Sequence, residues 1–136
     1  MMRTIRGFAV GLTALLVCAA SGEDTSDTLI QAIRNNDLTS IKTQLRKGAD
    51  VNTRDRRGST LLMHAAIAGS PDAVKLLIDS GADVNAKNSF DETALLLCAA
   101  DPQKARMLID KGADVNARSK TVGRTPLMIA ANCDGC

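Results

Sequence analysis

The chain has 136 residues, of which 45% are apolar, with two phenylalanines, no tryptophan or tyrosine, and a formal net charge of +2. The 17 basic residues include Arg3 and Arg6 near the N-terminus, so 15 remain to balance the 15 acidic ones. The small excess of positive charge therefore belongs to the first few residues, and it gives no reason to expect nucleic acid as a partner.

Residues 1–22 have the pattern of a secretory signal peptide. Arg3 and Arg6 precede an uncharged, largely apolar run, and small residues close it at positions 18–22. We expect cleavage after Ala20 or Gly22 and a periplasmic or secreted protein, with the bacterial envelope favoured. The alternative is an uncleaved membrane anchor, but the run is shorter than the roughly 20 residues that a spanning helix needs. No other stretch is expected to span a membrane.

One five-residue block occurs three times in the rest of the chain. Gly48-Ala49-Asp50-Val51-Asn52 returns at 81–85 and again at 112–116, at spacings of 33 and 31 residues. Self-similarity at such a period is typical of stacked repeat proteins. Because each repeat contacts only its neighbours, these proteins form extended surfaces suited to binding.

A second motif precedes the recurring block. The stretch Gly58-Ser59-Thr60-Leu61-Leu62-Met63-His64-Ala65-Ala66 has counterparts at 91–99 and 123–131. In this order and spacing the two motifs resemble the ankyrin repeat, with its Gly-x-Thr-Pro-Leu-His-x-Ala-Ala stretch and its Gly-Ala-Asp-Val-Asn block. The resemblance covers about residues 24–136. It implies an all-α repeat solenoid of stacked helix-turn-helix units with β-hairpin tips.

The motifs divide the chain into units. We expect an N-terminal capping repeat at 23–52, repeats at 53–85 and 86–116, and an incomplete repeat at 117–136. In the first unit, the polar residues Gln31, Arg34, Asn35 and Asn36 suit an outward-facing cap. The repeat at 86–116 has two residues fewer between its helices, where we expect a tighter turn.

Local signals agree with this division. Thr60, Thr93 and Thr125 stand where helices are expected to start, and their hydroxyls can cap free N–H groups. Pro126 suits a first helical position. Gly48, Gly81 and Gly112 follow the second helices and are expected as left-handed C-caps. The family's histidine is Met63, Leu96 and Met128 here, so we expect its hydrogen bond to the helix-start threonine to be absent.

The last unit is expected to contain a first helix and no second one. Stacked repeats expose apolar faces unless a terminal unit covers them. We therefore expect either a truncated remnant of a longer array, or a surface completed by a partner or by self-association.

The sequence offers little for catalysis, and we predict a protein that is not an enzyme, with no cofactor and no metal. His64 is the only histidine, and a structural role on its helix is favoured over that of a general base. The repeated glycines belong to helix ends and form no phosphate-binding loop.

The cysteines suggest an alternative function. Cys133 and Cys136 have the spacing of a redox dithiol, but no thioredoxin-like context surrounds them. A local disulfide or two free thiols is the favoured interpretation, and a redox or thiol role remains the alternative. Cys98 takes an alanine position of the repeat and is expected to be buried.

Binding has better support, through the resemblance. In the ankyrin family the hairpin tips and the exposed side of each first helix form a concave contact surface. The matching partner-binding positions are Arg56, Arg57, Ser59, Ile67, Ser89, Phe90, Glu92, Thr121, Val122 and Arg124. Ala68, Ala100 and Asp101 are their neighbours on the helices.

Aromatic and charged residues make the tips distinctive. Phe90 is the only aromatic residue after the leader, and an exposed aromatic with arginines nearby is favoured at binding hot spots. The first tip carries Arg54, Arg56 and Arg57 against one aspartate. The sequence thus predicts a module that binds a protein partner, one with an acidic surface facing the outer tips.

Overall fold

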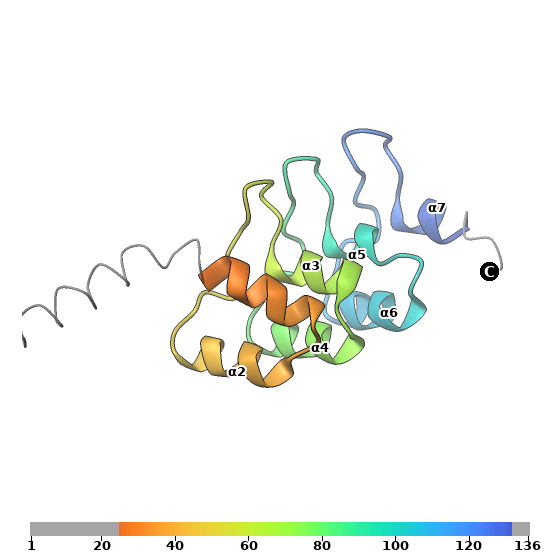
Figure 1. Cartoon of the computed structure of the whole chain (residues 1–136). Coiled ribbons are helices and arrows are strands. Elements are labelled where there is room, and N and C mark those ends of the chain that lie inside the picture. Colours follow the sequence, from red (N-terminus) through yellow and green to blue (C-terminus); the bar gives the residue numbers. More distant parts are fainter. Residues whose placement is uncertain (1–24, 132–136) are drawn as a thin grey trace, which may run out of the picture.

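The computed structural model describes residues 25–131, and these form a row of helix pairs with three long loops on one side (Figure 1). Helical residues 25–34 and α2 (Leu38–Arg46) make the first pair, and α3 (Leu61–Ala68) and α4 (Pro71–Asp79) the second. The third pair is α5 (Ala94–Leu97) and α6 (Pro102–Asp110), and α7 (Pro126–Ala131) follows. The predicted leader and the pair Cys133 and Cys136 lie outside the described residues.

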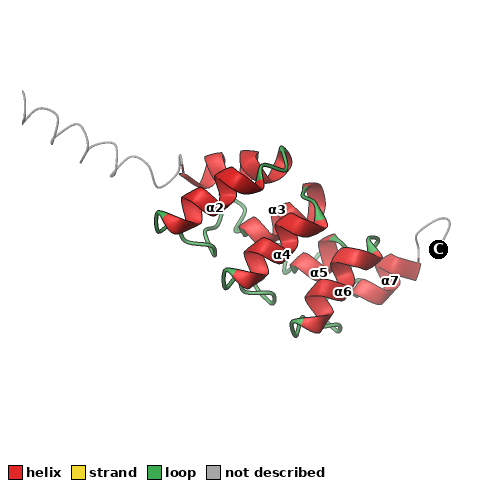
Figure 2. Cartoon of the chain, turned by 90° about the horizontal axis from the view of Figure 1, so that it is seen from below, coloured by secondary structure: helices red, strands yellow, loops and turns green. Residues whose placement is uncertain are grey.

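The helices lie in two rows. α3 contacts both α4 and α5, and α4 contacts both α2 and α6. Residues 25–34, α3, α5 and α7 therefore form an inner row next to the loops, and α2, α4 and α6 form an outer row (Figures 1 and 2). The predicted all-α repeat solenoid is confirmed.

Threonine caps begin the inner helices, as predicted. The Thr60 hydroxyl accepts a hydrogen bond from the Met63 N–H at 3.4 Å, and Thr93 does the same for Leu96. The Thr60 N–H in turn donates to the Met63 sulfur at 3.4 Å. The expectation that this position makes no hydrogen bond to the helix start is therefore wrong at Met63, because a thioether sulfur is itself a weak acceptor.

Asparagine side chains join successive units at the turns that follow the outer helices. These helices end before Gly48, Gly81 and Gly112, whose φ values are 95°, 95° and 88°. The Asn85 side-chain oxygen accepts from the Asp114 N–H at 2.7 Å, and its amide donates to the Gly112 carbonyl at 3.1 Å. Asn52 makes the same pair of bonds to the unit that follows it. We call Asn52 and Asn85 the asparagine ladder.

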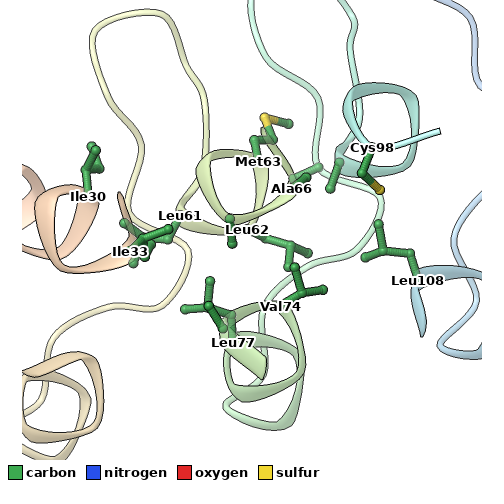
Figure 3. Close-up of a cluster of buried hydrophobic side chains, with 14 of the residues drawn as sticks. Ile30, Ile33, Leu61, Leu62, Met63, Ala66, Val74, Leu77, Cys98 and Leu108 are labelled. Atoms are coloured by element: carbon green, nitrogen blue, oxygen red, sulfur yellow. The ribbon is translucent and has the colours of Figure 1, made fainter. Parts of the chain in front are cut away.

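The core is aliphatic and continuous between units. Leu61 and Leu62 of α3 are buried together with Val74 and Leu77 of α4, whose side chains point toward them (Figure 3). Cys98 is buried as predicted, at 3% exposure, on the side of α3 away from the first unit. Fully burying one leucine or valine side chain contributes about 1.5–3 kcal/mol, so these contacts between helices stabilise the stack.

The missing two residues in the third unit shorten its first helix. α5 has four residues where α3 has eight, and residues 98–101 connect it to α6. The expected tighter turn is therefore wrong. Asp101 must act as the N-cap of α6, accepting from the Gln103 and Lys104 N–H groups, and the chain reaches it by unwinding the end of α5. The buried Lys104 amine donates across the stack to the Ala66 carbonyl at 3.3 Å.

Candidate functional site

The three tips, residues 53–59, 86–92 and 118–124, are tied to one another through the main chain. The Ser89 N–H donates to the Arg57 carbonyl at 3.1 Å, and the Lys120 N–H donates to the Phe90 carbonyl at 2.9 Å. Each tip has the shape of a hairpin, and the only regular pairing among the described residues is an isolated bridge between Arg54 and Thr60. These links make the tips one continuous wall.

Arg54 belongs to this wall. One of its guanidinium nitrogens donates to the Gly58 carbonyl at 2.8 Å and to the Lys87 carbonyl of the next tip at 2.6 Å. The side chain of Arg54 therefore links two tips, and because it is exposed it also adds a positive charge to the protein surface.

A hollow of about 690 Å³ lies between the first unit and tip 53–59. We call it the basic hollow, because four arginines line it, together with the Asp55–His64 pair. The arginines are Arg34, Arg54, Arg56 and Arg57. Among the described residues, Arg34, Arg56 and Arg57 are exposed and none of them makes an ion pair.

Asp55 and His64 form the floor of the basic hollow. The His64 Nε2 lies 2.9 Å from one carboxylate oxygen of Asp55, and both side chains are largely buried. The other oxygen accepts from the N–H groups of Arg57 at 2.8 Å and Ser59 at 2.9 Å. Burial acts to raise the pKa of Asp55, but the hydrogen bonds outweigh it and hold that pKa below its ordinary value. Asp55 is thus an ionised group that shapes its own tip.

A second hollow, of about 450 Å³, continues from the first along the inner helices. We call it the apolar hollow for the four apolar residues that it adds to the groove, Ile67, Ala68, Phe90 and Leu97. The other seven residues that line it are polar or charged. Ile67 is 62% exposed and Phe90 43% exposed, although both are large apolar side chains. Arg34, Asp55, Arg57 and His64 line both hollows, so the two form one groove.

The groove contains six of the ten positions predicted to bind a partner. These are Arg56, Arg57, Ser59, Ile67, Phe90 and Glu92. The other four, Ser89, Thr121, Val122 and Arg124, line neither hollow. Ser89 instead serves the wall, since its hydroxyl donates to the Arg57 carbonyl at 2.8 Å.

Several groove residues were missed at the sequence level. Gln31 and Arg34, expected on an outward-facing cap, line the basic hollow. Asp55 and His64 pair across nine positions, which no motif spacing indicated. The available signal was that His64, Ile67 and Ala68 lie three and four positions apart and so share one face of α3.

A third hollow, of about 380 Å³, lies beside α7 and is separate from the groove. Ile109, Val115 and Leu127 line it, with exposures of 47%, 48% and 77%. Asn116 also lines it, at the place where the asparagine ladder would continue. Self-association through this face stays a prediction.

Within residues 25–131, no helix is long and apolar enough to cross a membrane. In the same part of the chain, no three His, Cys, Asp or Glu side chains group so that they could hold a metal ion.

Similar proteins were found in several organisms. Over 80 residues the chain is 40% identical to the mitochondrial disaggregase of Bos taurus, covering 57% of this chain and 12% of that protein. It is 39% identical over 57 residues to the putative ankyrin repeat protein YahD of Escherichia coli, covering 42% of this chain and 28% of YahD. Over 126 residues it is 36% identical to the Notch protein of Drosophila melanogaster, covering 89% of this chain but 5% of Notch. The chain thus matches only a small part of these relatives.

A family model for ankyrin repeats in three copies matches residues 29–119 and 74–136. The two matches together cover nearly all of the described stack. Ankyrin repeats are generally non-enzymatic modules for protein–protein interaction. The chain belongs to the ankyrin repeat family.

Proposed function

We propose that this chain is a non-enzymatic module that binds a protein partner through the groove formed by its tips and inner helices. The observation that carries the proposal is the exposure of Ile67 and Phe90 in a concave wall beside arginines that make no ion pairs within the described residues. Aromatic and arginine side chains are enriched at the centres of protein interfaces, which fits Phe90 and the neighbouring arginines. Main-chain hydrogen bonds already hold the tips in place, so the tips lose little conformational entropy when a partner binds.

The partner presents acidic surface to the outer tips, and the encounter takes place outside the cytoplasm. Charge supports the first part, because Arg56 and Arg57 are exposed on tip 53–59 and Arg124 is exposed on tip 118–124. The basic, apolar and small-residue pattern of residues 1–22 supports the second. The partner is therefore sought in an envelope or secreted fraction.

The proposal is tested by capture of the partner and measurement of its affinity. Phe90→Ala should weaken binding by about 1–2 kcal/mol or more, since truncating an exposed aromatic anchor removes its contact area. Phe90→Ala combined with Arg56→Glu should abolish capture from the envelope or secreted fraction. Both variants should melt at the temperature of the unaltered protein, because neither side chain is buried.

Ile109→Ala is the matched control. Ile109 is 47% exposed on the outer helix α6 and lines neither hollow of the groove, so its truncation should leave affinity unchanged. Equal affinity of the Phe90→Ala variant and the unaltered protein would remove the groove as the binding site.

A further inference from the structure

We propose that the groove accepts a short peptide segment of its partner with two parts, an acidic cluster at one end and an apolar side chain at the other. This inference rests on the proposed function and names the chemistry that the groove recognises. The acidic end lies over Arg34, Arg56 and Arg57 in the basic hollow. The apolar side chain lies between Ile67 and Phe90 in the apolar hollow.

The basic hollow has positive charge that its own residues do not neutralise. Four arginines line it, against Asp27 and Asp55. Asp55 is already engaged by two main-chain N–H groups and by His64. Apart from the leader the chain is formally neutral, so this excess of positive charge is local. Guanidinium groups bind carboxylates through paired hydrogen bonds, and Arg34 and Arg57 are exposed and available for them.

The apolar hollow suits a side chain and not a second anion. Ile67, Ala68, Phe90 and Leu97 supply its apolar wall. The charges along this hollow are balanced, since Arg34 and Arg57 are matched by Asp55 and Glu92. The excess of positive charge that attracts carboxylates is found in the basic hollow, so the acidic end of the ligand belongs there.

This division also favours a peptide over a nucleic acid. A single-stranded nucleic acid carries a charge at every nucleotide and is held by stacking on aromatic platforms. Phe90 is the one Phe, Tyr or Trp among the described residues, and the excess of positive charge is limited to the basic hollow, so most of a charged backbone would lie outside it. A peptide can carry carboxylates at one end and a leucine at the other.

One segment serves both hollows because they share a wall. Arg34, Asp55, Arg57 and His64 line both of them. His64 is held by Asp55 on the same face of α3 as Ile67, so the pair lies at the boundary between the two parts. We expect Arg57 to bind a carboxylate of the ligand, because its side chain lines both hollows. Its main chain is held in place by hydrogen bonds to Asp55 and Ser89.

The experiment uses the full chain and a fluorescent decapeptide with four glutamates followed by two leucines in a Gly/Ser background. Fluorescence anisotropy should show binding that weakens with added salt. It should weaken at least tenfold when the glutamates become serines, and at least tenfold when the leucines do. In the protein, Arg34→Glu with Arg57→Glu should weaken binding by the same factor. Arg106→Glu on exposed α6, which lines neither hollow, should change it less than twofold.

A charge swap keeps the test independent of folding. A peptide with four lysines in place of the glutamates should bind the Arg34→Glu, Arg57→Glu variant more tightly than it binds the unaltered protein. Equal binding of the acidic peptide by that variant and by the unaltered protein would overturn the proposal. So would binding of a single-stranded oligonucleotide as tight as that of the peptide, since it would show a non-selective anion site.

Failure of this inference is distinguishable from failure of the proposed function. If a partner is captured through Phe90 but the peptide neither binds nor displaces it, the two-part peptide is wrong and the binding function stands. If neither partner nor peptide binds, both are wrong. Displacement of the captured partner by the acidic peptide, and not by its serine version, supports both.

Discussion

Asp55 shows how one side chain holds a tip and shapes the groove. One oxygen accepts two main-chain N–H groups of its own tip, and the other faces His64 of α3. The pKa of Asp55 lies below its ordinary value, since hydrogen bonds to the carboxylate outweigh the effect of burial. A carboxyl with a lowered folded-state pKa stabilises the fold above its unfolded-state pKa, and this contribution is lost as the pH falls through the folded value.

The Asp55→Asn variant should lack this pH dependence. Its amide oxygen can still accept from Arg57 and Ser59, so the tip is retained, and the free energy of unfolding at pH 7 should fall by about 1 kcal/mol. The difference between the unaltered protein and the variant should shrink as the pH drops below about 5, where the unfolded carboxyl begins to protonate. Urea unfolding at several pH values measures it. Asp37, whose pKa is lowered mainly by the Ser40 hydroxyl, is present in both proteins and cancels. A constant difference from pH 7 to pH 2 would contradict this account.

At the scale of elements, the units are joined by hydrogen bonds at defined points as well as by apolar contact. The asparagine ladder links each Gly-Ala-Asp turn to the next, and Asn85 accepts and donates across 29 and 27 positions. These bonds recur because the five-residue block recurs. Local signals therefore predicted the helix starts, the glycine ends and the stacking.

Contacts between units were not predictable in the same way. Arg54 has the appearance of a free tip charge in the sequence, but it donates to the Lys87 carbonyl 33 positions away. Arg34 reaches the groove only because the first inner helix lies beside α3. No pattern inside one repeat contains such information, so the sequence indicated the groove's exposed tips and missed its floor. The short α5 was missed because the two-residue deletion does not tighten the turn. Instead, Asp101 keeps its place as the N-cap of α6, and the last residues of α5 leave the helix to reach it.

Replacing Asn85 tests the ladder. Asn85→Ala should lower the free energy of unfolding by about 1–2 kcal/mol, since two inter-unit hydrogen bonds are lost from an exposed site. Asn116→Ala is the matched control, because the Asn116 side chain makes no hydrogen bond within residues 25–131 and its loss should cost less than about 0.5 kcal/mol. Chemical denaturation of both variants gives the values. Equal destabilisation by the two would show that the ladder bonds add nothing.

At the scale of the whole molecule, the helices within residues 25–131 differ in how far neighbours cover them: those in the middle of the stack have neighbours on both sides, and α7 has the described neighbour α5 on one side. α3 and α4 each contact helices of neighbouring units, and their apolar side chains are largely buried. In α7, Leu127 is 77% exposed and Met128 is 54% exposed. A helix with fewer buried contacts unfolds locally at a lower cost in free energy. The free energy of local unfolding should therefore decrease along the stack toward α7.

Native-state hydrogen exchange measures this gradient. Amides of α3 and α4 should exchange most slowly, and those of α7 should exchange at least a hundredfold faster. The comparison is made at several protein concentrations. Protection of α7 equal to that of α4, rising with concentration, would contradict the gradient and show that a second copy covers this face.

The main-chain links between the tips have a consequence for how this surface can change over time. Because the Arg57 and Phe90 carbonyls, and not side chains, accept the bonds from the next tip, residues such as Arg56, Phe90 and Val122 can be exchanged without loosening the wall. At these positions, unlike Arg54 and Ser89, whose side chains help to hold the wall, recognition and folding depend on different atoms. Mutation can therefore explore new partners at little cost to the scaffold, which makes the tips an evolvable and engineerable part of the protein.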